Sequence, residues 1–177
     1  NDPYDIEVGI DPEMLGHIFE NLLEDNKDKG AFYTPKEIVQ FMSRESIIQY
    51  LKGHTKENIH NAIELLIING KVSDDLQSKV AAKEVYGLLK NIKVCDPAIG
   101  SGAFPMGVLN ILYNTRRLLY GFTQGKEDFS PATIKREIIR DNIFGVDIEQ
   151  GAVDIARLRF WLALVVDEIK PKPLPNL

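Results

Sequence analysis

The segment that most restricts the possible fold is VCDPAIGSGAF, residues 94–104. A short apolar run ends in Asp96, two glycines follow as Gly100 and Gly102, and apolar residues at helical spacing come next. A strand, a tight glycine turn and a helix start in this order are typical of ligand-binding turns in parallel α/β sheets. Glycine lets a ligand approach the backbone closely, and the helix N-terminus favours negative charge.

The residues around this turn discriminate between ligands. A phosphate-binding P-loop needs lysine and then Ser or Thr after the second glycine, where this chain has Ala103 and Phe104. A dinucleotide fingerprint needs a third glycine at position 105, which is Pro105. The carboxylate of Asp96 would repel phosphates but can accept a hydrogen bond from an ammonium group. We therefore expect a ligand with an amino-acid end, as in S-adenosylmethionine.

A second short apolar strand is expected within residues 142–147, and it ends in Asp147. A carboxylate at the tip of a neighbouring strand can accept hydrogen bonds from both hydroxyls of a ribose. NAD proteins and methyltransferases share this device, so Asp147 indicates an adenosine ligand without choosing between them. Asp96 and Asp147 could instead only cap the helices that follow them. The glycines and both acids at two adjacent strand ends favour the ligand site.

Helical signals dominate the rest of the chain. Thr34 and Glu37 have capping-box spacing with Pro35 between them, which predicts a helix with Thr34 as its N-cap. The expected helices cover residues 12–23, 35–52, 57–69, 74–89, 103–120, 131–140 and 149–168. This order predicts a helical region over residues 1–91 and the first βαβα part of a parallel sheet over residues 92–177.

Composition narrows the function further. The chain has 177 residues, 44% of them hydrophobic, and a formal net charge of -5. The acidic balance argues against a self-sufficient nucleic-acid binder. No apolar run reaches the roughly 18 residues of a membrane span, so we expect no membrane contact. The single cysteine, Cys95, suits a reducing cytoplasm, and its apolar neighbours predict that it is buried. The three histidines lack metal-ligand spacing, so no metal site is predicted.

Three stretches together are similar to a known family. VCDPAIGSGAF closely resembles the cofactor motif of N6-adenine DNA methyltransferases, in the variant found in type I modification subunits and fused type II restriction-modification enzymes. GAFYTP, residues 30–35, resembles the upstream motif of that family, which extends here over residues 30–42. NIFGVDIEQGAVDIARLRFWLALV, residues 142–165, resembles the segment with the ribose-binding acid. Residues 54–90 resemble an insertion between the first two motifs.

The resemblance implies a helix-dominated α/β chain carrying the first part of a Rossmann-like methyltransferase sheet, with S-adenosylmethionine as cofactor. Carried over residue by residue, it places Phe32, Tyr33 and Thr34 on the methionine side. Asp96, Ala98, Gly100 and Gly102 would form the turn beneath the amino-acid end. Asp147 would hold the ribose, and Ile148 would pack on the adenine ring.

One departure is important. The family's catalytic motif, Asn-Pro-Pro followed by an aromatic residue, is absent, and Asn176 is followed directly by Leu177. We therefore expect the cofactor-binding half of a restriction-modification enzyme, inactive alone, whose DNA contacts lie in downstream regions. Such a piece could self-associate. A methyltransferase acting on protein or RNA is the alternative enzyme, although GAFYTP favours DNA. A non-catalytic helical interaction module with a degenerate nucleotide fold is a third reading.

Overall fold

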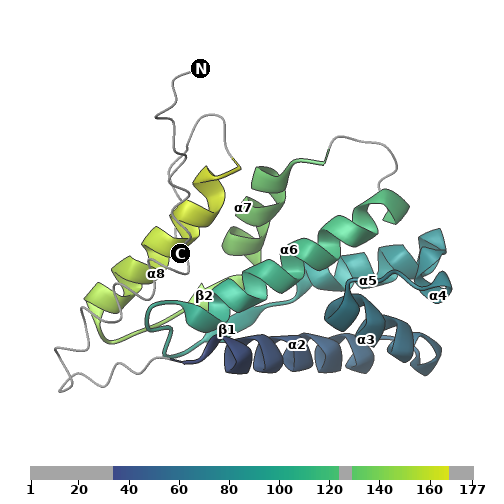
Figure 1. The fold of residues 1–177 in the computed structure, drawn as a ribbon, viewed down its shortest axis with the longest axis horizontal. Coiled ribbons are helices and arrows are strands. Elements are labelled where there is room, and N and C mark those ends of the chain that lie inside the picture. Colours follow the sequence, from purple (N-terminus) through teal and green to yellow (C-terminus); the bar gives the residue numbers. More distant parts are fainter. Residues whose placement is uncertain (1–33, 124–128, 168–177) are drawn as a thin grey trace, which may run out of the picture.

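The structure is a computed structural model that describes residues 34–123 and 129–167 (Figure 1). The helix expected over residues 12–23, and the predicted site residues Phe32 and Tyr33, lie outside these ranges. The described elements, in chain order, are α2 (Lys36–Gly53), a 3-10 turn (Glu57–Ile59), α3 (His60–Asn69), α4 (Asp74–Gln77), α5 (Lys79–Asn91), β1 (Val94–Asp96), α6 (Ala103–Thr123), α7 (Pro131–Asp141), β2 (Ile143–Gly145) and α8 (Gln150–Val165).

Several helix ends lie where local sequence signals predict them. Helix α3 ends at Gly70, which has a left-handed φ of 64°. The Gly70 N–H donates to the Leu66 carbonyl at 3.1 Å, and the following Lys71 N–H donates to the Leu65 carbonyl at 3.3 Å. Helix α7 begins with Pro131 at its first position, and the Ser130 hydroxyl accepts a hydrogen bond from the Thr133 N–H at 3.3 Å. These ends depend on residues adjacent in sequence, which explains why they could be predicted.

Two helix starts differ from the prediction. The capping box at Thr34 is wrong: Pro35 is the N-cap of α2, with an extended ψ of 141°, and no side chain caps the helix. The Thr34 hydroxyl is therefore one residue too far from the first turn. The single helix expected over residues 74–89 is divided at Ser78, whose extended backbone ends α4. Its hydroxyl then caps α5 by accepting from the Ala81 N–H at 3.2 Å.

The two strands form a small parallel sheet, as the alternation of strands and helices predicts. Val94 pairs with Ile143, Cys95 with Phe144 and Asp96 with Gly145. Cys95 is exposed, which corrects the expectation of a buried thiol. Its ladder partner Phe144 is also exposed, at 46%. This face of the sheet is thus open to solvent, while Ile143 on the other face is buried against the helices.

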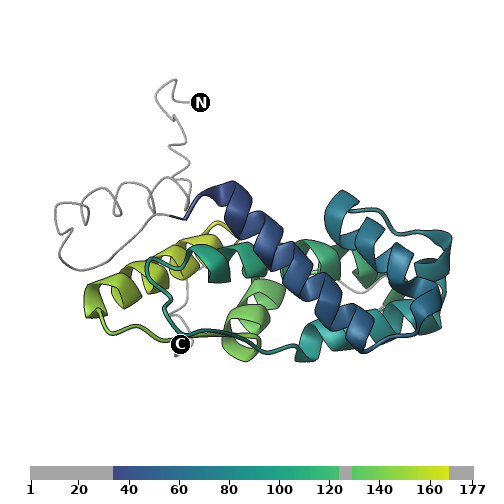
Figure 2. The ribbon, with the colours of Figure 1, turned by 90° about the horizontal axis from the view of Figure 1, so that it is seen from below.

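Helix α6 lies at the centre of the molecule, between α8 at one end and the group α3–α5 at the other (Figures 1 and 2). It packs against α2, α5, α7 and α8. Leu109, Leu112 and Leu119 on this helix are completely buried. They join buried residues of α2, α3 and α5 in one hydrophobic cluster that also includes Phe160 of α8. The helices that precede β1 and those that follow it therefore share a core.

Asn142 connects three elements at the base of the sheet, and it is completely buried. Its N–H ends α7 by binding the Ile138 carbonyl, and its carbonyl accepts from the Val94 N–H at 2.8 Å. Its side-chain amide donates to the carbonyls of Ile92 at 2.7 Å and Lys90 at 3.0 Å, just after and within the last turn of α5. This residue fixes where β1 begins relative to β2.

The helices of residues 34–123 and 129–167 include none with both the length and the apolar character that a membrane crossing requires.

Candidate functional site

The glycine turn is anchored to the second strand by backbone hydrogen bonds. The Asp96 carbonyl accepts from the Val146 N–H at 2.9 Å, and the Val146 carbonyl accepts from the Ile99 N–H at 3.0 Å. The side chain of Asp96 also shapes the turn, because its Oδ1 accepts from the Ala98 N–H at 3.0 Å. The turn therefore begins in a fixed position beside residue 147.

Both predicted glycines adopt conformations that other residues rarely take. Gly100 has a φ of 51° and Gly102 a φ of 85°. The Gly102 N–H closes the turn on the Ile99 carbonyl at 2.8 Å, and α6 starts at the next residue. A side chain at either position would strain the backbone. The sequence thus has glycine at the two positions where this turn requires it.

Asp147 contacts the turn directly. Its Oδ2 accepts a hydrogen bond from the Gly100 N–H at 2.8 Å, and its Oδ1 accepts from the Glu149 N–H at 2.9 Å. These two bonds, with the one from Glu149 the larger cause, lower the pKa of Asp147 below its usual value, so the carboxylate is held as an anion. Each carboxylate oxygen has two lone pairs. The backbone N–H of Ile148 contributes a smaller lowering of the same pKa, and the carboxylate as a whole keeps capacity to accept a further hydrogen bond.

Two N–H groups of the turn are already engaged within the chain. Those of Gly100 and Gly102 are donated to the Asp147 carboxylate and to the Ile99 carbonyl. The physical reason is that a carboxylate at the adjacent strand end lies within reach of the Gly100 N–H.

The remaining predicted residues surround this centre less closely. Ala98 is exposed on the turn, and Ile148, next to Asp147, is fully exposed and free to contact a planar ring. Thr34 is partly buried just before α2. Asp96, Gly100 and Asp147 are brought together by the hydrogen bonds above. Thr34 is connected to them by none of the described side-chain hydrogen bonds.

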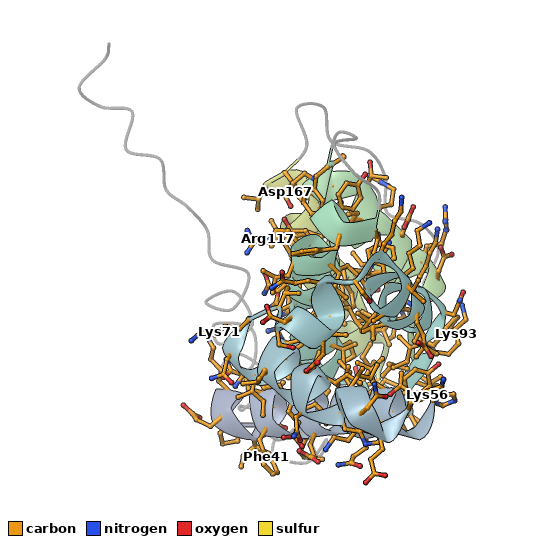
Figure 3. The ribbon with its side chains drawn as sticks, turned by 90° about the vertical axis from the view of Figure 1, so that its right-hand side faces the viewer. Phe41, Lys56, Lys71, Lys93, Arg117 and Asp167 are labelled. Carbon is orange, nitrogen blue, oxygen red and sulfur yellow. The ribbon has the colours of Figure 1, made fainter. Side chains whose placement is uncertain are left out.

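A cavity of about 460 Å³ lies beside the turn. Its walls come from α2, the strands and the start of α6, and include Met42, Asp96, Pro97 and Phe104. Gly100, Gly102 and Asp147 do not line it, so it borders the turn through Asp96 without enclosing Asp147. Further out on α2, Phe41 projects away from the body of the molecule and is 68% exposed (Figure 3).

Sequence reasoning missed two residues that support the turn. Gly145 has Ile99 packed so closely over it that an added Cβ would lie 2.2 Å from the Ile99 Cδ1. Arg159 of α8 is only 7% exposed and donates from Nη1 to the Ser101 carbonyl at 2.9 Å. The sequence contains a signal for Arg159, because this arginine lies within the mostly apolar residues 155–166. It follows Ala152 by seven residues and Ala156 by three, so the three residues share one face of a helix. In the described ranges, no cluster of three His, Cys, Asp or Glu side chains could hold a metal ion.

Two curated proteins are similar to the chain along most of its length. A protein of Methanocaldococcus jannaschii named as a type II restriction enzyme and methyltransferase is 33% identical over 172 residues, which cover 90% of this chain. A protein of Escherichia coli O9:H4 named as the adenine-specific methyltransferase BrxX is 24% identical over 160 residues, or 81% of the chain.

The chain is therefore related to one segment of a protein named as a restriction enzyme and methyltransferase, and to one segment of a protein named as an adenine-specific methyltransferase. It spans 14% and 13% of the length of these two relatives. No protein-family model matches the sequence, and no solved structure gives a significant match. The similarity to these two proteins agrees with the resemblance identified from the three sequence motifs.

Proposed function

We propose that the chain binds S-adenosylmethionine as the cofactor-binding segment of an adenine-N6 DNA methyltransferase in a restriction-modification enzyme. The observation that carries the proposal is the 2.8 Å hydrogen bond from the Gly100 N–H to Asp147 Oδ2. It joins two motifs 47 residues apart, each selected from the sequence for contact with one ligand.

The arrangement suits the parts of this cofactor. In this proposal Asp96 would accept from the ammonium group, and Ala98, Gly100 and Gly102 would form the backbone beneath the amino-acid end. Asp147 would hold the ribose hydroxyls with the acceptor capacity that its carboxylate retains. Ile148 offers an exposed apolar surface to the adenine ring. By the sequence resemblance alone, Phe32, Tyr33 and Thr34 would complete the methionine side. The bound cofactor supplies the methyl group, and this chain's residues hold and orient it.

Other steps of the reaction belong, in this proposal, to regions beyond the 177 residues. The Asn-Pro-Pro-aromatic element, which would hold a flipped adenine, is not in the sequence. DNA contacts would also come from those regions, because this chain carries a net charge of -5 and would repel the phosphate backbone. The reaction would take place in the cytoplasm. Residues 1–91 would supply the upstream motif, and residues 92–177 would supply the first part of the Rossmann-like sheet.

Calorimetric titration of the chain with S-adenosylmethionine and with NAD tests the proposal. We expect weak but measurable binding of S-adenosylmethionine and weaker binding of NAD. Asp147→Asn should reduce the S-adenosylmethionine affinity at least about tenfold, since hydrogen bonds to a charged group contribute about 1.5–3 kcal/mol each. Asp154→Asn removes an exposed carboxylate from the nearby helix α8 and is the matched control. Tighter binding of NAD, or no binding of either ligand, would refute the assignment.

An assay with labelled cofactor and unmethylated DNA tests the division of labour. We expect no methyl transfer by the 177-residue chain alone. Reproducible incorporation by pure protein would show that a catalytic group exists within it.

A further inference from the structure

Arg159 lies directly beneath the glycine turn. Its guanidinium donates from Nη1 to the Ser101 carbonyl at 2.9 Å and to the Ser101 hydroxyl at 3.4 Å. Helix α8 lies close to the glycine turn at this point. A Cβ added to Gly102 would lie 3.1 Å from the Ala156 Cβ and 3.4 Å from the Ala156 Cα. Arg159 follows Ala156 by three residues, so both lie on the helix face that meets the turn.

The contact with the Ser101 carbonyl fixes a whole peptide unit. The peptide between Ser101 and Gly102 is planar and trans, so its carbonyl and its N–H point in opposite directions. Arg159 holds the carbonyl end, and the Ile99 carbonyl holds the N–H end at 2.8 Å. This peptide cannot rotate without losing both bonds, and one of them is assisted by a charge.

The three consecutive residues of the turn are then held by one segment of the chain. Val146 binds the Ile99 N–H, Asp147 binds the Gly100 N–H and Arg159 binds the Ser101 carbonyl. All three partners come from the unit formed by the end of β2 and α8. The first two use the strand end that the sequence had marked, whereas Arg159 reaches the turn from the helix behind it.

We propose that Arg159 is a positioning residue for the amino-acid end of the cofactor. It touches no ligand and acts through the Ser101–Gly102 peptide, which it holds in the orientation that the turn needs. This inference rests on the proposed cofactor function. It predicts that loss of the guanidinium weakens ligands with an amino-acid end and spares those without one.

Calorimetry on the full 177-residue chain, with two ligands, tests the inference. S-adenosylhomocysteine has the amino-acid end, and 5′-methylthioadenosine shares its adenosine part but lacks that end. Arg159→Gln should weaken S-adenosylhomocysteine about tenfold and change 5′-methylthioadenosine less than twofold. Arg159→Lys, which keeps a charged donor, should recover part of the affinity. Arg157→Gln removes an exposed arginine from the same helix and should change neither affinity.

A second measurement needs no ligand. Hydrogen exchange of the Gly102 amide should become about tenfold faster in Arg159→Gln, while amides buried in α6 keep their rates. Equal loss of both ligands, unchanged binding of both, or unchanged exchange at Gly102 would overturn the inference. If Arg159→Gln does not fold, Arg159→Lys replaces it in the test. This variant should weaken S-adenosylhomocysteine by a smaller factor and leave 5′-methylthioadenosine unchanged, and any other result would also overturn the inference. Absence of binding in the unaltered chain would instead refute the proposed function, and the inference with it.

Discussion

Replacing Asn142 by alanine should destabilise the protein, because the side-chain hydrogen bonds of this buried residue are lost. The side-chain amide donates to the Ile92 carbonyl at 2.7 Å and the Lys90 carbonyl at 3.0 Å, with a longer contact of 3.4 Å to Leu89. The alanine variant leaves one fully buried and one partly buried carbonyl without this donor. A buried polar group left unsatisfied costs about 1–3 kcal/mol, so we expect a loss of about 2–3 kcal/mol.

Urea denaturation followed by circular dichroism measures this loss, and the slope with denaturant should stay unchanged. For a chain of this size the corresponding fall in melting temperature is about 4–12 °C. Asn142→Asp should lose more, because it removes both donors and places negative charge against carbonyl oxygens. Asn110→Ala on α6 is the control, since Asn110 is exposed and should change stability by less than about 0.5 kcal/mol. If Asn142→Ala behaves like this control, Asn142 does not join α5 to the sheet as described.

Three further predictions concern charge and surface. Glu137→Gln should cost about 2–3 kcal/mol in urea unfolding, because Arg116 is 1% exposed and would lose its carboxylate partner at 2.6 Å; a loss below 0.5 kcal/mol would contradict this. The lowered pKa of Asp147 contributes stability above its unfolded pKa, near 4, that is lost as pH falls through the folded value. Unfolding at pH 6 and pH 3 should therefore show a smaller acid loss in Asp147→Asn than in the wild type. Self-association is expected, since Phe41 and Phe144 are exposed at 68% and 46%; a strict monomer in sedimentation over a wide concentration range, without binding of a hydrophobic dye, would contradict it.

Local signals and strand order explain the parts of the fold that could be predicted. Gly70 ends α3 and Ser130 starts α7 through contacts within a few residues. The closeness of Gly100 and Asp147 follows from a more general rule, because the carboxyl ends of adjacent parallel strands meet at one edge of the sheet. That rule predicts from the sequence alone that the two motifs lie side by side.

The parts that could not be predicted depend on contacts distant in sequence. The exposure of Cys95 depends on which face of the sheet the helices cover. The apolar residues next to Cys95 in the sequence do not predict which face that is. The interaction of Arg159 with Ser101 joins residues 58 positions apart. The Thr34 cap failed for another reason, since a capping-box pattern can lie one residue away from the true helix start. Sequence patterns therefore predicted that the glycine turn and Asp147 meet, and long-range packing determined how the turn is supported.

The most direct test of the central claim is a heteronuclear NMR titration of the chain with S-adenosylmethionine. The account predicts concentration-dependent shifts of the amides of Gly100, Gly102 and Ile148, while amides of the distant helix α3 stay in place. The same shifts should be lost in Asp147→Asn, with the rest of the spectrum preserved. No shift at millimolar cofactor, or shifts confined to residues away from the β1–α6 turn and the end of β2, would contradict the account.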